Sequence, residues 1–296
     1  MIFKKDEEMK VNVVTGGGSG IGKAVAAMLP KDGPVIIAGR TPQKLERTAL
    51  ELNAEGCRIL TAVCDVSKRE DVRALALYAS SLGDVDRVIH CAGVSGSMAD
   101  RETIIRINAL GTLHVNQEFF KVMRGGCIVD IASDSGYMLP RILLLRRSAY
   151  RLALADEDAF AAKAARKARL VGKDRIDCQI AYMISKDFAR RYSERCAFKY
   201  MALKGIRVFS VSPGFVKTPM TELEKSKESE NMLSYTGHRR GADPEELAYV
   251  ITALADERAR YLIGSDILCD GGAVNNGFGA LTARKRCKER SLTENW

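Results

Sequence analysis

The fold class predicted by the 296-residue sequence is α/β, with a doubly wound parallel sheet of about seven strands flanked by helices. Short apolar runs rich in β-branched residues alternate with longer stretches of helical composition along most of the chain. Residues with chemical or conformational roles follow six of these runs, at Thr15, Arg40, Asp65, Gly93, Ser133 and Pro213. Because ligands bind at the carboxyl ends of the strands in such sheets, this placement indicates a binding site there.

Seven apolar runs are expected to form the strands, at residues 11–15, 34–39, 58–64, 85–90, 126–132, 206–211 and 266–269. The stretches between them have helical composition, most clearly at about 100–123 and 243–256. Pro244, the second residue of the latter stretch, favours the start of a helix. Since crossovers between parallel strands are right-handed, these units are expected to stack side by side into one sheet.

The stretch Val11–Gly22, VNVVTGGGSGIG, reads as a buried strand that turns through glycines into a helix. Such a turn directs free backbone N–H groups and the positive end of the helix dipole at one point. Glycines there let a pyrophosphate approach the backbone without meeting a Cβ. The alternative is a glycine-rich turn that binds nothing.

The composition is that of an ordinary globular protein, with 46% hydrophobic and 28% charged residues. No stretch approaches the roughly 20 apolar residues of a membrane span, and the first residues contain no apolar core for a secretory signal. The 8 cysteines show neither a CxxC pair nor a metal-ligand spacing. We therefore expect free thiols, no metal site and a cytoplasmic location.

The net charge of +9 is unevenly distributed. Residues 141–178 hold 10 Lys/Arg against 5 Asp/Glu, and residues 277–296 hold 5 against 2. The rest of the chain is close to neutral, which argues against a nucleic acid as partner. We expect residues 1–276 to form a single dinucleotide-binding and catalytic domain with an insertion at 141–177, followed by a basic, disordered tail at 277–296.

Two Tyr-x-x-x-Lys patterns occur, at Tyr182–Lys186 and Tyr200–Lys204. Residues four apart share one helix face, so the lysine can favour ionisation of the tyrosine. Lowering a phenol pKa from about 10 to about 7 requires roughly 4 kcal/mol. Tyr182 is expected near the start of its helix, at the carboxyl edge of the sheet, whereas Tyr200 lies roughly 27 Å further along the axis. Tyr182 is therefore the catalytic candidate and Tyr200 a packing or surface residue.

Taken in order, these residues resemble the classical short-chain dehydrogenases/reductases, whose sheet is a doubly wound (Rossmann) fold. The resemblance covers about residues 10–272 and rests on Thr15-Gly16-x-x-x-Gly20-Ile21-Gly22, Asp65, Asn108 in Asn-Ala-Leu-Gly-Thr, Ser133, Tyr182, Lys186 and Pro213-Gly214 with Thr218. It implies a cofactor site formed by Gly16, Ser19, Gly20, Ile21, Gly22, Arg40, Thr41, Asp65, Val66, Ala92, Gly93, Tyr182, Lys186, Pro213, Gly214, Val216 and Thr218.

The same resemblance implies a role for each of four catalytic residues. Tyr182 is the general acid in reduction and the general base in oxidation, and Ser133 hydrogen-bonds the substrate oxygen. Lys186 lowers the pKa of Tyr182 and binds the nicotinamide ribose, and Asn108 holds a water that relays protons. Ser135 is a competitor for the role of Ser133, and the alternative for Ser133 itself is a hydroxyl that caps a turn.

The end of the second predicted strand bears on the choice of cofactor. An acidic residue there binds the ribose of NAD, whereas an arginine accommodates the 2′-phosphate of NADP. The sequence has Arg40-Thr41 and no acid, which favours NADP(H), with NAD(H) still open. The alternative is a solvated surface arginine.

Two features depart from the common family pattern. His90-Cys91-Ala92-Gly93 replaces the usual Asn-Asn-Ala-Gly, and His90 is expected to be a buried or edge residue. The insertion at 141–177 is similar to one in bacterial 3α-hydroxysteroid dehydrogenases/carbonyl reductases. We hypothesise that it covers the substrate mouth or an oligomer interface; as a basic helix it could instead touch an anionic membrane surface.

The sequence thus predicts an oxidoreductase that interconverts a secondary alcohol and a ketone, acting on a fairly apolar small molecule and assembling as a homodimer or homotetramer. A hydroxysteroid dehydrogenase and a catalytically silent NADP(H)-binding protein are the alternatives. The segment after Pro219 is either an exposed loop or a substrate cover with Met220, Leu223, Met232 and Tyr235 as pocket walls.

Overall fold

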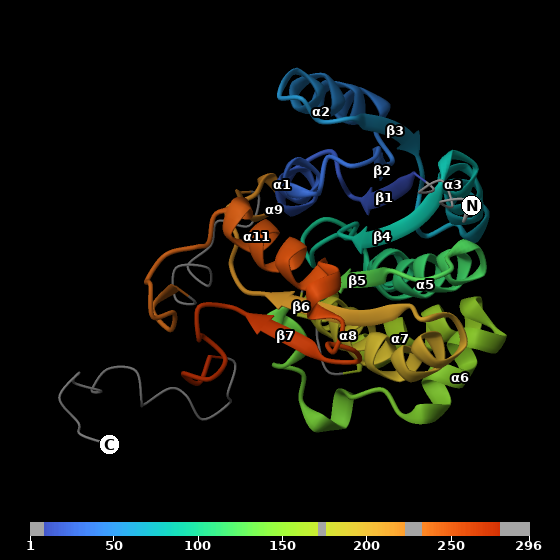
Figure 1. Cartoon of the computed structure of the whole chain (residues 1–296). Coiled ribbons are helices and arrows are strands. Elements are labelled where there is room, and N and C mark those ends of the chain that lie inside the picture. Colours follow the sequence, from blue (N-terminus) through green and yellow to red (C-terminus); the bar gives the residue numbers. More distant parts are fainter. Residues whose placement is uncertain (1–8, 171–175, 223–232, 279–296) are drawn as a thin grey trace, which may run out of the picture.

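The sheet of the computed structural model has seven strands, all parallel, in the order β3-β2-β1-β4-β5-β6-β7 (Figure 1). The structure describes residues 9–170, 176–222 and 233–278. The strands are β1 (Lys10–Thr15), β2 (Val35–Gly39), β3 (Ile59–Val63), β4 (Asp84–His90), β5 (Cys127–Ile131), β6 (Arg207–Pro213) and β7 (Asp266–Cys269). The strand order reverses between β1 and β4, which creates the crevice expected at such a switch point.

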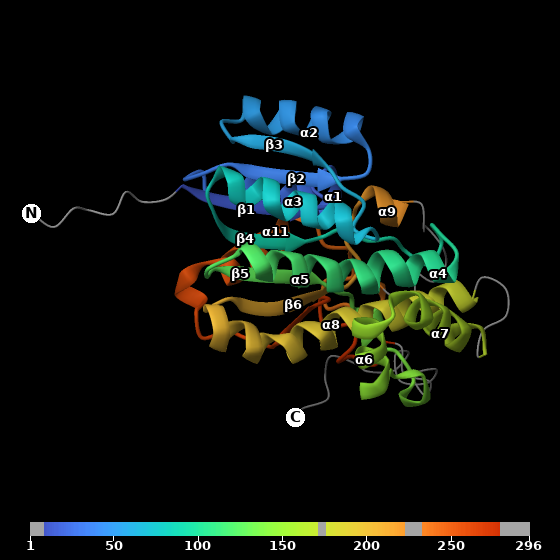
Figure 2. The ribbon, with the colours of Figure 1, turned by 90° about the vertical axis from the view of Figure 1, so that its right-hand side faces the viewer.

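Helices cover both faces of the sheet (Figures 1 and 2). They are α1 (Gly20–Met28), α2 (Pro42–Ala54), α3 (Arg69–Leu82), α4 (Arg101–Ile104), α5 (Gly111–Val122), α6 (Arg147–Ala155), α7 (Glu157–Arg169), α8 (Ile176–Lys204), α9 (Pro219–Glu222) and α11 (Pro244–Ala255). Short 3-10 turns are η2 (Asp134–Gly136), η3 (Arg141–Leu143) and η4 (Glu257–Ala259), and η1 (Ile105–Leu110) is a π-helical segment that joins α4 to α5. The fold class predicted from the sequence is confirmed.

The central strands contribute to hydrophobic cores on both faces of the sheet. Along β1, Val11 and Val13 pack into one core and Val14 into the other. On β5, Ile128 packs into the same core as Val11 and Val13, and Val129 packs into the same core as Val14. This alternation follows from the period of two in a strand, and it explains why the sequence shows continuous apolar runs rather than alternating ones.

Three of the predicted elements differ from the structure in their bounds or their helix type. Helix α8 begins at Ile176 in the part of the chain that the structure describes, so Tyr182 lies two turns inside the helix rather than near its start. Strand β6 continues to Pro213 because its last residues pair with β7. The helix predicted at about 100–123 contains the π-helical segment η1, which a hydrophobic pattern alone does not reveal.

Residues 141–169 of the predicted insertion pack against the body of the molecule. Helix α7 contacts α4, α8 and η1 (Figure 2). Phe160 of α7 is buried with its ring centroid 5.1 Å from that of Phe188 on α8. Tyr150 of α6 stacks on the same Phe188 ring. The insertion therefore extends the hydrophobic core over the outer side of α8.

Several predictions about composition can be compared with the described residues. All seven cysteines in them are free thiols, and no group of His, Cys, Asp or Glu within them could hold a metal ion. None of the helices described is both long and apolar enough to cross a bilayer. The tail from residue 279 onward, Leu223 and Met232 lie outside the described residues.

Candidate active site

The turn between β1 and α1 has the geometry of a phosphate cradle. Gly16 and Gly20 adopt positive φ angles of 68° and 53°, a region that favours glycine. A Cβ on Gly16 would lie 2.8 Å from the backbone nitrogen of Ala92. Ser19 is the N-cap of α1 but its side chain makes no capping hydrogen bond. The first turn of α1 is therefore free to bind an anion, and the residues present fit a dinucleotide.

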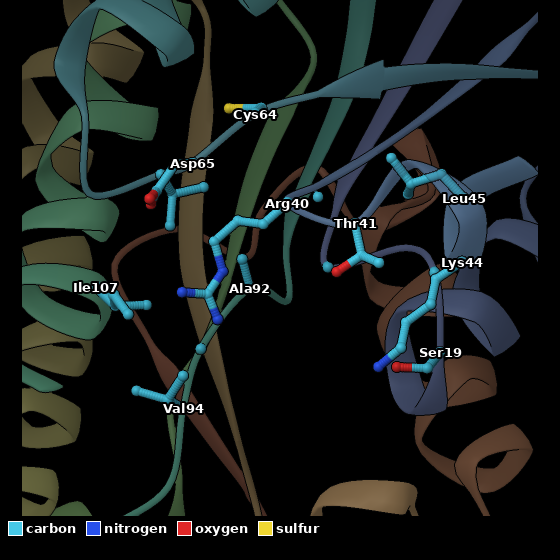
Figure 3. Close-up of a pocket in the computed structure, with 15 residues that line it drawn as sticks. Ser19, Arg40, Thr41, Lys44, Leu45, Cys64, Asp65, Ala92, Val94 and Ile107 are labelled. Atoms are coloured by element: carbon cyan, nitrogen blue, oxygen red, sulfur yellow. The ribbon is translucent and has the colours of Figure 1, made fainter. Parts of the chain in front are cut away.

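A cleft runs from this turn along the carboxyl ends of β2, β3 and β4 (Figure 3). It is lined by Gly16, Gly18, Ser19, Gly39, Arg40, Thr41, Lys44, Leu45, Cys64, Asp65, Val66, Ala92, Gly93, Val94 and Ile107. Of the residues predicted to contact a cofactor, eight line it, namely Gly16, Ser19, Arg40, Thr41, Asp65, Val66, Ala92 and Gly93. The structure brings these together although they come from four separate chain segments.

Lys44 is a cleft residue that sequence reasoning missed. It is the third residue of α2, and it lines the cleft together with Arg40 and Ser19 (Figure 3). The signal was present in the sequence as a second cation four residues after Arg40, at the start of a helix. Two cations therefore line the cleft, with the Lys44 ammonium beside Ser19 and the Arg40 guanidinium extending toward Ala92 and Val94 (Figure 3).

Four of the remaining predicted cofactor residues lie at the glycine turn, namely Gly20, Ile21, Gly22 and Thr218. A Cβ on Gly22 would meet the Gly16 carbonyl oxygen at 2.4 Å, so this glycine lets α1 pack on the turn. A Cβ on Gly20 would lie 3.1 Å from the Cγ2 of Thr218. Ile21 follows Gly20 in α1, and Pro213, Gly214 and Val216 lead from the end of β6 toward Thr218.

His90 takes over the link between the central strands that the usual amide provides. Its Nδ1 lies 2.7 Å from the Oγ1 of Thr15 on β1, and the same hydroxyl accepts a hydrogen bond from the Ala92 backbone nitrogen at 3.2 Å. Burial lowers the pKa of His90 to about 3, helped by the nearby Lys186 charge. A neutral imidazole thus fixes the loop that carries Ala92 and Gly93.

Lys186 lies on α8 next to the cleft wall. Its Nζ donates a hydrogen bond to the Ile131 carbonyl oxygen at 2.8 Å and lies 5.8 Å from the centroid of the Tyr182 ring. A Cβ on Gly93 would be 3.5 Å from this Nζ. Burial lowers the pKa of Lys186 to about 8, opposed by Cys91 and Asp130. The ammonium therefore sits between the tyrosine and the cleft.

Asn108 lies within the π-helical segment η1. Its Oδ1 accepts from the Val94 backbone nitrogen and its Nδ2 donates to the Val94 carbonyl oxygen, both at 2.9 Å. The Nδ2 also donates to the Ser185 Oγ at 3.1 Å. The side chain thus ties the loop after β4 to α8. Its backbone carbonyl accepts a hydrogen bond from the Thr112 hydroxyl at 2.8 Å, and the predicted role in holding a water stays a prediction.

Ser133 is buried at the end of β5 and leads into η2. Its Oγ donates to the Asp134 Oδ1 at 3.1 Å and accepts from the Ser135 backbone nitrogen at 3.2 Å. Gly136 packs on α8, since a Cβ there would meet the Lys186 carbonyl carbon at 3.1 Å. Ser133 thus lies directly before a turn that packs on α8, the helix that carries Tyr182.

Asp134 is a second residue that sequence reasoning missed. Its side chain is buried, and its Oδ2 has no hydrogen-bond partner. Burial raises the pKa of this carboxyl to about 6, against the effect of the Ser133 hydrogen bond. A carboxyl group that changes charge in this range therefore lies beside the Ser133 hydroxyl.

The two Tyr-x-x-x-Lys patterns are separated as predicted. Tyr200 is buried at the far end of α8, where its ring centroid lies 4.3 Å from that of Phe120. Lys204 donates to backbone carbonyls at the end of α5, including that of Phe120. The second pattern is a packing element, and the prediction for Tyr200 is confirmed.

A glycine turn on a helix N-terminus, a cleft at the switch point and a Tyr–Lys pair beside it define a nicotinamide-dinucleotide oxidoreductase. A family model described as short chain dehydrogenase matches residues 10–145. A second, described as enoyl-(acyl carrier protein) reductase, matches residues 167–274. The chain belongs to the short-chain dehydrogenase/reductase family and is an NAD(P)-dependent short-chain oxidoreductase. Residues 146–166, within the predicted insertion, fall between the two matches.

Relatives of known sequence and structure agree with this assignment. The chain is 29% identical over 263 residues to the short-chain dehydrogenase/reductase bsc3 of Alternaria brassicicola, covering 87% of this chain and 93% of that protein. It is 29% identical to the 3-oxoacyl-(acyl-carrier-protein) reductase FabG of Thermotoga maritima, covering 90% and 98%. A short-chain type dehydrogenase/reductase from Mycobacterium ulcerans superposes with a TM-score of 0.70 at 25% identity, covering 90% of each chain.

Proposed function

We propose that the protein is an NADP(H)-preferring oxidoreductase that interconverts a ketone and a secondary alcohol. The observation that supports this most directly is the presence of two cations, Arg40 and Lys44, in the wall of the cleft. Guanidinium and ammonium groups suit a phosphate, and no carboxylate lies at the end of β2 to bind a free ribose hydroxyl. Arg40 and Thr41 would receive the 2′-phosphate, with Lys44 as a second charge.

The remaining cofactor contacts are proposed from the same cleft. The first turn of α1, with Gly16, Gly20 and Ser19, would bind the pyrophosphate. Asp65 and Val66 border the far end of the cleft, where the adenine would lie. Gly93 and Lys186 border the end toward the catalytic residues, where the nicotinamide ribose would lie.

The catalytic roles follow from the chemistry of each side chain. When bound, the nicotinamide supplies the hydride. Tyr182 would give its hydroxyl proton to the substrate oxygen in reduction and take it back in oxidation. The Lys186 ammonium would favour the phenolate form of Tyr182, and Ser133 would donate a hydrogen bond to the substrate oxygen. Asn108 would act by holding Val94 and Ser185 in place.

The substrate class is proposed as a fairly apolar carbonyl compound. Met220 on α9 is half-buried, and Tyr235 packs on Phe278 with a centroid distance of 5.5 Å. These side chains belong to the segments that follow β6 and β7, on the side of the catalytic residues. A homo-oligomer in the cytoplasm remains the predicted setting.

The cofactor proposal is tested by steady-state kinetics with NADPH and NADH. We expect a lower KM for NADPH, and Arg40→Ala or Lys44→Ala should raise that KM about tenfold while leaving the KM for NADH unchanged. Arg47→Ala is a matched control, because Arg47 lies one turn further along α2 and its nearest carboxylate is Glu51. Equal KM values for the two cofactors in the wild type would contradict the preference.

A further inference from the structure

A buried polar cluster joins the insertion to the wall of the cofactor cleft. Glu157 is the first residue of α7, and its Oε1 accepts hydrogen bonds from Arg69 at the start of α3. Its Oε2 lies 2.7 Å from the Nε2 of His114 on α5. The other ring nitrogen of His114, Nδ1, lies 2.9 Å from the backbone carbonyl oxygen of Val66, a cleft-lining residue.

The proton count of this arrangement is constrained by its geometry. Both partners of His114 are acceptors, because a backbone carbonyl has no proton to donate and a carboxylate has none either. The backbone carbonyl of Val66 can only accept, so the Nδ1 of His114 carries the proton of that contact. The Nε2 on the other side of the ring faces the Glu157 Oε2. His114 is 1% exposed, so the ring is fixed between these two partners.

The surrounding groups keep Glu157 charged. Burial alone would raise the pKa of Glu157, but hydrogen bonds from Arg69 and His114 hold it below its usual value. Glu118 adds a second carboxylate and pairs with Arg69 and Lys121. The Glu157 carboxylate is therefore fixed between the Arg69 guanidinium and the His114 ring.

The end of the cluster at Val66 reaches the cofactor cleft. Val66 packs closely on α5, since a Cβ on Gly111 would lie 2.9 Å from its Cγ2. The neighbouring Asp65, also in the cleft wall, is fixed because its Oδ1 accepts from both the backbone and the hydroxyl of Ser67. With its side chain packed and its carbonyl bound by His114, the Val66 peptide has a single position.

We propose that Glu157 is a positioning residue for the dinucleotide: through His114 it fixes the Val66 peptide, so that the insertion supports cofactor binding from behind the cleft. The proposal rests on the proposed function, in which Asp65 and Val66 border the adenine. It assigns the first turn of α7 a role in cofactor affinity, distinct from a substrate lid or an oligomer interface.

The test compares two adjacent acids on the first turn of α7. Glu157→Ala removes the carboxylate that holds His114, whereas Asp158→Ala removes one whose partner is Arg106, at 2.8 Å, and which has no link to Val66. We expect Glu157→Ala to raise the dissociation constant and the KM for NADPH about tenfold. The kcat at saturating cofactor and the KM for the carbonyl substrate should change less than twofold, and Asp158→Ala should leave all four values unchanged.

Rescue by a conservative variant separates positioning from a general loss of helix stability. Glu157→Gln offers an amide N–H₂ that can donate to the Nε2 of a neutral His114, while the ring Nδ1–H still donates to Val66. We therefore expect Glu157→Gln to bind NADPH within about threefold of the wild type. An unchanged dissociation constant in Glu157→Ala, or an equal rise in Asp158→Ala, would overturn the proposal.

A measurement on the wild-type protein covers the case in which a variant does not fold. The sequence contains 3 histidines, so ¹⁵N-labelled imidazole signals can be assigned individually. The Nδ1 of His114 should carry a proton that is hydrogen-bonded to the Val66 carbonyl oxygen, and an unprotonated Nδ1 would refute the proposal. If the wild type binds neither NADPH nor NADH, the proposed function fails; if it binds them and the Glu157 variants match the wild type, only this inference fails.

Discussion

The ammonium of Lys186 lies 5.8 Å from the centroid of the Tyr182 ring, one turn away on α8, and donates to the carbonyl oxygen of Ile131 at the end of β5. The hydrogen bond fixes the cation relative to the sheet, and the helix fixes the tyrosine relative to the cation. This relationship places the proposed acid–base group at the carboxyl edge of β5, beside the cleft wall at Gly93.

Tyr182→Phe tests whether the protein turns over or only binds its cofactor. Loss of the hydroxyl should lower kcat for carbonyl reduction by about 10²–10⁴-fold, the usual contribution of a general acid, while the dissociation constant for NADPH stays within twofold. Tyr200→Phe is the matched control, since Tyr200 lies in the second Tyr-x-x-x-Lys pattern and packs on Phe120. Activity retained in Tyr182→Phe would contradict the catalytic role.

Ser133→Ala and Ser135→Ala distinguish the two serines at the end of β5. Removing a donor to the developing oxyanion lowers kcat by about 10²–10³-fold, and we expect this loss for Ser133→Ala. Ser135→Ala should retain kcat within about threefold, because the Ser135 hydroxyl donates to Asp134 at 3.4 Å and its backbone N–H is unaffected. The reverse ranking in initial-rate measurements would reassign the role to Ser135.

Asp130→Asn tests the energetic effect of a buried carboxyl on β5. Asp130 accepts hydrogen bonds from Asn116 and Ser193, yet burial raises its pKa to about 6. The folded state therefore binds this proton more tightly than the unfolded chain, where an aspartate titrates near 3.9. The free energy of unfolding should fall by about 3 kcal/mol from this group as pH rises from about 4 to above 6.

Urea denaturation at pH 4 and pH 7 measures that change in both proteins. Asp130→Asn has no titrating group at this position. Its free energy of unfolding should therefore decrease less between pH 4 and pH 7 than that of the wild type. Parallel pH dependence in the two proteins would show that Asp130 titrates normally despite its burial.

Phe160→Ala tests whether the insertion is part of the folded core. Phe160 is 1% exposed and meets Phe188 of α8, so its truncation should lower the free energy of unfolding by about 3–5 kcal/mol. Leu154→Ala on α6, where the side chain is 58% exposed, should cost less than about 1 kcal/mol. Equal effects of the two variants in chemical denaturation would indicate that α7 is not packed against α8.

The sequence alone determined the fold class and the edge at which the site forms. Continuous apolar runs of strand length, rich in β-branched residues, favour strands buried on both faces, and their alternation with helical stretches favours a parallel sheet. Thr15, Arg40, Asp65, Gly93 and Ser133 each follow such a run, so local order was sufficient to bring them to one edge.

Tertiary structure alone decided the contacts between residues far apart in the chain. Lys44 lines one cleft with Asp65 and Ala92 only because the strands before these segments end at one edge of the sheet. Glu157 meets His114, and His114 meets Val66, only because α7 packs against α8, α4 and η1. The periodicity of apolar residues in the sequence fixes which face of a helix is apolar. It carries no information on which buried polar groups will face each other. The pairing of buried polar groups follows from the packing of whole helices and strands, because each buried donor and acceptor must find a hydrogen-bond partner.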